Sequence, residues 1–207
     1  YIQSDKYLQD IVRDKRYWEV KRQNIHQREK DMEKTMVSAT SIKQFNKNNT
    51  YNNKQVAFIE FKTDSISDKK ALEKMAASWG EKDIYGRDVS LEFSKKFNQQ
   101  NIPERFFGIT TQLNDFEHLD YKKILGVAET YNEDSKLLDI FFLQTKPKFI
   151  NNGELKKFKD IGKALMKNIL STIKYKKVII YPTPDTTEFY KKIGFRVVNT
   201  GTMILKR

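Results

Sequence analysis

Residues 137–196 decide the fold, because strand-like and helix-like patterns alternate through them: LLDIFFL at 137–143, FKDIGKALMKNIL at 158–170, VIIY at 178–181 and FYKKIGFR at 189–196. The first segment is almost continuously apolar, which is typical of a strand covered on both faces. In the second, Ile161, Leu165, Ile169 and Ile173 recur every four residues and predict a helix with one buried face. This alternation predicts an α/β fold.

The second half of the stretch contains a short helix between two strands. Two prolines interrupt the chain after the strand at 178–181. Asp185 or Thr186 can then cap a helix that contains Phe189 and Tyr190. The glycine of KKIGF ends that helix, and the apolar residues after it predict a further strand.

Two segments of this stretch resemble signatures of one family. Ile161-Gly162-Lys163-Ala164-Leu165 is similar to the acyl-CoA pyrophosphate loop of the GNAT superfamily of N-acetyltransferases. FYKKIGF at 189–195 is similar to the family's C-terminal signature, an aromatic–Tyr pair followed by a basic stretch and Gly-Phe. The resemblance implies a mixed, mostly antiparallel sheet with helices on both faces. It also implies transfer of an acetyl group from acetyl-CoA, as co-substrate, to an amine of an unidentified acceptor.

The resemblance also implies where the coenzyme binds, between splayed parallel strands at 137–145 and 178–181. The pantetheine arm is expected along Leu143, Gln144 and Thr145. The pyrophosphate is expected at the start of the next helix, on Lys157, Phe158, Lys159, Asp160, Ile161, Gly162, Lys163 and Ala164. Asp160 stands where the family usually has a glycine, and the loop at 147–162 is longer than the common form.

Three residues are candidates for the chemistry. The resemblance assigns Tyr190 as the general acid, and a phenol, with a pKa of about 10, is protonated at neutral pH and able to donate. The general base stays open between Glu129 and Asp139, carboxylates on neighbouring predicted strands that could each act through water. Either could equally be an exposed strand carboxylate.

The composition limits the other classes of function. The chain has 207 residues, a formal net charge of +12 and no cysteine, which excludes disulfides and fits a reducing, cytoplasmic location. Its two histidines, His26 and His118, lead us to expect no metal site, and no apolar run approaches membrane-spanning length. The charge favours a polyanionic partner such as RNA, although the scattered lysines fit a compositional bias equally well.

Residues 1–48 are expected to form a charged helical extension of a domain at 49–207. Residues 1–40 contain neither Gly nor Pro, and Ile11, Trp18, Ile25 and Met32 recur every seven residues. This row predicts either a homodimer helix or a helix that lies on its own domain. Residues 44–53 are polar and predict a loop. Because the chain begins with Tyr rather than Met, we expect further residues before it in the native protein.

The remaining strands are predicted at 55–61, 106–111 and 124–131, with a helix after 64–68. A second resemblance competes here. Residues 54–61 are similar to the RNP1 segment of RNA-recognition motifs, and residues 86–93 to the last strand of that fold. The alternative prediction is therefore a binding module for RNA or protein, either RNA-recognition-like or a GNAT-like fold with weak catalysis. On the acetyltransferase interpretation, residues 89–97 form a helix instead.

Overall fold

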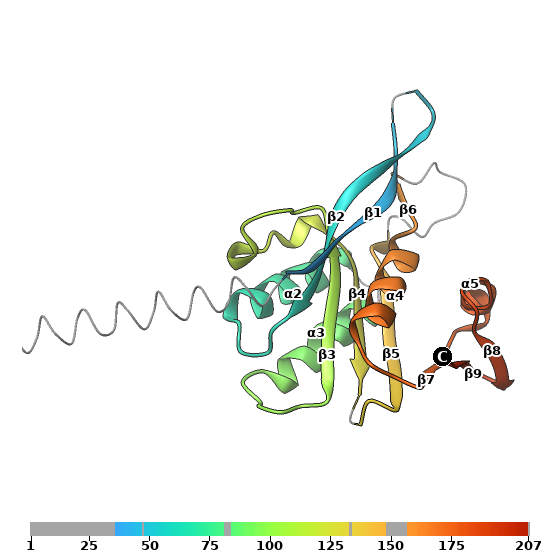
Figure 1. Cartoon of the computed structure of the whole chain (residues 1–207). Helices are drawn as coiled ribbons and strands as arrows, with labels where there is room; N and C mark the ends of the chain where they lie inside the picture. The colour runs from blue at the N-terminus through green and yellow to red at the C-terminus, as the bar shows by residue number, and fades with distance from the viewer. Residues whose placement is uncertain (1–35, 47, 81–83, 133, 148–156, 207) are drawn as a thin grey trace, which may run out of the picture.

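The computed structural model describes residues 36–46, 48–80, 84–132, 134–147 and 157–206. In these ranges the chain forms one nine-stranded sheet in the order β6-β1-β2-β3-β4-β5-β7-β9-β8 (Figure 1). Paired strands are antiparallel throughout this sheet except β5 and β7, which run parallel. The strands are β1 (Met36–Phe45), β2 (Tyr51–Phe61), β3 (Glu104–Thr110), β4 (Ile124–Tyr131), β5 (Leu137–Thr145), β6 (Phe158–Lys159), β7 (Lys177–Ile180), β8 (Arg196–Asn199) and β9 (Thr202–Lys206).

Helices cover both faces of the sheet (Figure 1). They are α2 (Ile66–Trp79), α3 (Ile84–Lys96), α4 (Ile161–Thr172) and α5 (Thr187–Lys192). The first two pack on one face, around a cluster of buried side chains that includes Phe61, Phe93 and Phe106. The other two pack on the opposite face, where Leu165 and Tyr190 join a second cluster. The mixed, mostly antiparallel α/β fold predicted from the sequence is therefore confirmed.

The predicted helix after residues 64–68 is present as α2, and side chains fix its start. Ser65 accepts a hydrogen bond from the N–H of Asp68 at 3.2 Å, which satisfies one of the free donors of the first turn. Asp68 in turn accepts the backbone N–H of Lys62 through Oδ2 at 2.7 Å. The end of β2 and the start of α2 are thereby tied together.

Phe58 shows that the RNA-recognition interpretation is wrong. Its side chain is fully buried in the cluster under α4, where it stacks on Phe107 with ring centroids 5.2 Å apart. Residues 86–93, predicted as the last strand of that module, lie in α3. The aromatic residue that would stack a base thus fills the core instead, and the helix expected on the acetyltransferase interpretation is confirmed.

The largest correction concerns β1. Residues 36–40 were expected to end a long helix, but they begin a strand that pairs antiparallel with β2 from Met36 opposite Ile59 to Phe45 opposite Tyr51. The predicted loop at 44–53 shrinks accordingly, because both its ends belong to these strands. The sheet therefore starts upstream of the boundary predicted at residue 48. The helix predicted at residues 1–35, with its self-association, lies outside the described residues and stays a prediction.

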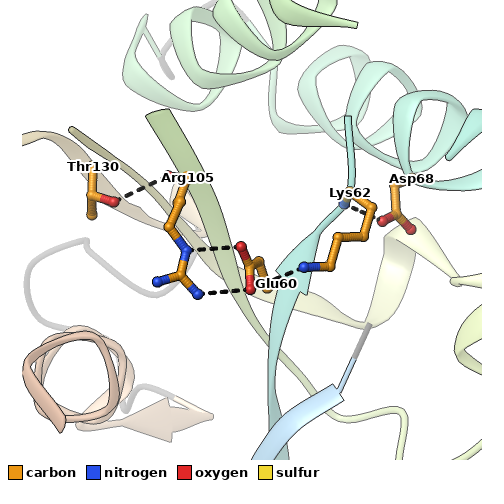
Figure 2. Close-up of polar contacts among 5 residues, drawn as sticks. All are labelled: Glu60, Lys62, Asp68, Arg105 and Thr130. Carbon is orange, nitrogen blue, oxygen red and sulfur yellow. Dashed lines mark hydrogen bonds and ion pairs between the residues drawn. The ribbon is translucent and has the colours of Figure 1, made fainter. Parts of the chain in front are cut away.

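An ion cluster joins β2 to β3 (Figure 2). Arg105 donates to both carboxylate oxygens of Glu60, at 2.9 Å and 2.8 Å, and Lys62 approaches the same carboxylate at 3.1 Å. The backbone carbonyl of Arg105 accepts a hydrogen bond from Thr130 on β4 at 3.3 Å. Burial alone would raise the pKa of Glu60, but hydrogen bonds and charges from Arg105 and Lys62 lower it below its usual value.

Candidate active site

The one parallel strand pair in the described sheet ends early. β5 and β7 pair from Leu137 opposite Lys177 to Ile140 opposite Ile180, and β7 then stops. β5 continues to Thr145, so its last residues have no strand beside them on that side within the described sheet. The pairing therefore opens at Ile140, which agrees with the predicted positions of the two splayed strands.

A β-bulge marks the point where the strands separate. On β4, Glu129 lies opposite Phe142 and Thr130 lies opposite Ile140, so Phe141 is an extra residue in β5. A bulge bends its strand and leaves the extra residue unpaired in the ladder. The exposed fraction of Phe141 is 42%, which is high for a phenylalanine in the middle of a sheet.

The start of α4 lies against the unpaired end of β5. The absence of a side chain at Gly126, on the neighbouring strand β4, lets α4 lie close to the sheet, because a Cβ there would be 2.9 Å from Cγ2 of Ile161. A Cβ at Gly162 would lie 3.6 Å from Leu143 and 3.7 Å from Thr145, both on β5. It would also lie 3.4 Å from Phe189 on α5. The structure thus brings together the two signature segments and the end of β5.

The helix itself begins at Ile161 rather than at Phe158 as predicted. Asp160 precedes it in the left-handed conformation, with a φ of 64°, and its exposed side chain makes no capping hydrogen bond. This conformation favours glycine, and Asp and Asn tolerate it better than most other residues. Because the side chain of Asp160 does not cap α4, the N–H groups of the first turn lack that partner and could receive an anion.

The other predicted coenzyme residues lie in different surroundings. Phe158 and Lys159 form β6, paired with β1, so they precede the helix start rather than belong to it. Lys157, Lys159 and Lys163 are exposed, and Nζ of Lys159 lies 3.9 Å from the ring centroid of Tyr51. Ile161 and Ala164 belong to α4, and their side chains are buried between this helix and the sheet. On β5, Gln144 donates a hydrogen bond to the backbone carbonyl of Thr145 at 2.7 Å.

Tyr190 lies on α5 beside the same opening. Its ring packs edge-on against Phe189 and Phe195, and only 8% of its surface is exposed. Burial, with a smaller effect of Tyr85, raises the pKa of Tyr190 to about 12. The phenol is therefore protonated at neutral pH, as a proton donor must be.

Glu129 lies in the middle of β4, with its side chain under α3. It is only 4% exposed, and its Oε2 has no hydrogen-bond partner among the residues that the structure describes. Burial, followed by the charges of Glu92 and Glu104, raises the pKa of Glu129 to about 7, against the opposite effect of Lys96. A carboxyl group that titrates near neutral pH can accept a proton, so this position suits a general base.

Asp139 lies on β5 just before the bulge. Its Oδ1 is buried and has no hydrogen-bond partner in the described part of the chain. Burial raises the pKa of Asp139, and the charge of Lys177 opposes this shift. Both carboxylates that the sequence left open as the base are therefore perturbed, but Glu129 is the more deeply buried.

Two aromatic residues near the site were not predicted. Tyr85, at the start of α3, lies with its ring centroid 6.0 Å from that of Phe142 on β5. The sequence carries no signal for this contact, because it depends on how α3 crosses the sheet.

His118 forms a surface pair with Asp115, as expected for a residue outside the site.

Comparisons with solved structures find several that resemble this chain. A solved structure from Desulfovibrio desulfuricans, assigned to the GNAT family of acetyltransferases, matches 73% of this chain and 98% of its own, with 13% identity and a TM-score of 0.51. The N-acetyltransferase PseH from Campylobacter jejuni matches 73% of this chain and 98% of its own, with 19% identity and a TM-score of 0.48. Tetrahymena GCN5 matches 72% and 94%, with 12% identity and a TM-score of 0.48.

At this level of identity the first likeness shows the fold alone: the chain folds like this structure from the GNAT family. No protein-family model matches the sequence, and a search of curated proteins finds no match either. Within the described residues, no group of three or more His, Asp or Glu side chains could hold a metal ion. No helix of the described part is both long and apolar enough to cross a membrane.

Proposed function

We propose that the protein is an acetyl-CoA-dependent N-acetyltransferase. The observation that carries this proposal is the meeting of three features at one place: the open end of β5, the uncapped start of α4 and Phe189 on α5, whose ring packs against Tyr190. Acetyl-CoA supplies the acetyl thioester. The free N–H groups at the start of α4 suit its pyrophosphate, and Gly162 keeps that turn clear of a side chain.

The chain's own residues then handle two protons. Glu129 accepts a proton from the attacking amine, directly or through water, because its raised pKa matches neutral pH. Tyr190 donates its phenolic proton to the departing sulfur as the C–S bond breaks, and solvent later reprotonates it. Asp139 is the second candidate for the base, but its smaller burial makes Glu129 the better choice.

A thermal-shift titration with acetyl-CoA tests the proposal most directly. Ligand that binds the native state alone stabilises it by RT ln(1 + [L]/Kd), so the melting temperature rises as more ligand is added. We expect acetyl-CoA and CoA to raise it and a nucleotide without pantetheine to do so less. An unchanged melt at saturating acetyl-CoA, with a cooperative transition proving a folded protein, would rule the proposal out.

The second candidate is a GNAT-like module that binds a polyanion without catalysis. Asp160 favours it, because its exposed carboxylate lies next to the helix start where a pyrophosphate would bind. The net charge of +12 suits RNA or another polyanion. Salt-dependent RNA retention on a filter, together with an absent acetyl-CoA shift, would select this candidate.

A further inference from the structure

One face of β5 and β7 is lined by aromatic side chains around a carboxylate. Leu138 and Ile140 pack in the cluster under α4, so Asp139 between them points to the opposite face. On that face, Tyr181 is 53% exposed and Phe141 is 42% exposed. Large apolar rings exposed beside a half-buried carboxylate are unusual for a surface without a ligand.

The strand register shows how close these groups are. Tyr131 on β4 lies directly opposite Asp139, and its ring centroid is 6.2 Å from that of Phe141. Ile179 on β7 lies opposite Asp139 on the other side, and Tyr181 follows two residues later on the same face. Burial, followed by the charge of Asp139, raises the pKa of Tyr181, in line with this placement on one face.

The carboxylate of Asp139 suits a bound cation. Its Oδ1 is shielded from solvent and accepts no hydrogen bond from any described residue. A buried acceptor without a donor is costly, and the positive charge of an ammonium group beside the carboxylate would offset this cost. Aromatic faces attract the same ammonium group through their quadrupoles.

A second unpartnered carboxylate lies on the same face. Glu129 precedes Tyr131 by two residues on β4, so both side chains point toward α3, and the exposed fraction of Glu129 is only 4%. Diagonal neighbours across a regular antiparallel pair are roughly 7–8 Å apart at Cβ, and the bulge at Phe141 increases this spacing. Two such carboxylates, each with one buried oxygen that lacks a donor among the described residues, could attract two ammonium groups of one aliphatic chain.

We propose that the acceptor is an aliphatic diamine or polyamine, whose remote ammonium group binds between Asp139 and the rings of Tyr131, Phe141 and Tyr181. The amine to be acetylated then lies near Glu129. This inference rests on the proposed function and names its substrate class. The local acidity matters because the chain as a whole, with a formal net charge of +12, repels cations.

The surrounding charges fit this assignment. Glu104 lies on the same face, but Lys96 already binds it at 2.6 Å, so it does not compete for the ligand. Lys177 is the cation nearest in register to Asp139, since it lies two residues before Ile179. Removing its charge should therefore strengthen binding of a diamine.

Calorimetry with 1,4-diaminobutane and 1-aminobutane tests the inference on the full chain, with and without acetyl-CoA. We expect the diamine to bind more tightly than the monoamine. Asp139→Asn should weaken diamine binding roughly 10- to 100-fold and leave the monoamine unchanged, because one charge-assisted hydrogen bond is lost. Lys177→Gln should strengthen diamine binding. Glu73→Gln, on the exposed side of α2, is the control and should leave the diamine affinity unchanged.

The outcomes separate this inference from the proposed function. Equal affinities for diamine and monoamine, or an equal effect of Asp139→Asn on both, would overturn the inference even if acetyl-CoA binds. A preference for the diamine in a protein that does not bind acetyl-CoA would support the diamine site and rule out the proposed acetyltransferase activity. If Asp139→Asn does not fold, Phe141→Leu removes one ring from the site and keeps an apolar side chain, so a diamine affinity unchanged in that variant also overturns the inference.

Discussion

Arg105 binds Glu60 through two hydrogen bonds, from Nε to Oε1 at 2.9 Å and from Nη2 to Oε2 at 2.8 Å (Figure 2). Only 14% of the Glu60 side chain is exposed, so this pair is shielded more than an ordinary surface ion pair. Arg105→Lys cannot reproduce both bonds, and we expect it to lower the free energy of unfolding by about 1 kcal/mol in urea titrations. Lys95→Ala breaks an exposed pair with Glu92 and should cost less, about 0.5 kcal/mol or below.

The same pair should give the protein a pH-dependent stability. Because the folded-state pKa of Glu60 is lowered, its contribution is present above the usual carboxyl range and is lost as pH falls through the folded value. The difference in stability between the native chain and Arg105→Lys should therefore shrink between about pH 6 and pH 3. A difference that stays constant over this range would mean that the pair acts through packing alone.

Binding of acetyl-CoA should require a small, uncharged residue at position 162, whereas folding should not. We expect Gly162→Glu to abolish the thermal shift with acetyl-CoA, because it adds bulk and negative charge at the start of α4. Gly162→Ala is the matched control, since its Cβ makes ordinary contacts at 3.4–3.7 Å and a helix favours Ala over Gly. Retained binding in the Glu variant would move the coenzyme site elsewhere.

Asp160 should weaken coenzyme binding. Asn tolerates the left-handed conformation at φ 64° and removes the charge, so Asp160→Asn should bind acetyl-CoA roughly 2- to 10-fold more tightly. Isothermal titration measures this, with Asp64→Asn, an exposed residue before α2, as the control. Weaker binding in the Asn variant would indicate that Asp160 contacts the ligand or orders the turn.

Glu129 should control both activity and stability near neutral pH. If Glu129 is the base, kcat/KM should rise as the pH passes through about 7, the pKa of its carboxyl group. Glu129→Gln should remove this rise from the pH profile. A raised folded-state pKa also means that its stabilising contribution is lost as pH rises through the folded value. Glu129→Gln should therefore melt higher than the native chain at pH 8 but not at pH 4, a readout independent of activity.

Local patterns predicted much of the fold. The order β5, α4, β7, α5 follows from apolar runs, a four-residue helical repeat and proline and glycine breaks within one stretch. The same stretch contains both signature segments, so Gly162 and Tyr190 could be proposed as site residues from the sequence.

Features that depend on pairing could not be predicted. Residues 36–40 form a strand because β2 pairs with them, whereas their own sequence continues a segment without a helix breaker. Phe158 and Lys159 become β6 only through β1. The proximity of Asp139, Phe141 and Tyr131 depends on the strand register and on a β-bulge, and the sequence of β5 alone reveals neither.

Tyr190 provides the sharpest test of the chemistry. Its phenol, with a pKa of about 12, is protonated at neutral pH and can donate to the departing thiolate. Tyr190→Phe keeps the ring that packs against Phe189 and Phe195, and removes only the hydroxyl. Because general acid catalysis contributes about 10²- to 10⁴-fold, we expect kcat to fall by roughly that factor.

The coenzyme dissociation constant and the melting temperature of Tyr190→Phe should stay close to those of the native chain, since the hydroxyl acts mainly in the transition state. Phe195→Leu, which changes the packing around the same ring, is the matched control and should alter stability rather than kcat. Activity equal to that of the native chain in Tyr190→Phe would mean that the thiolate leaves unaided or is protonated by water. Tyr190 would then be a packing residue of the cluster under α4 and α5.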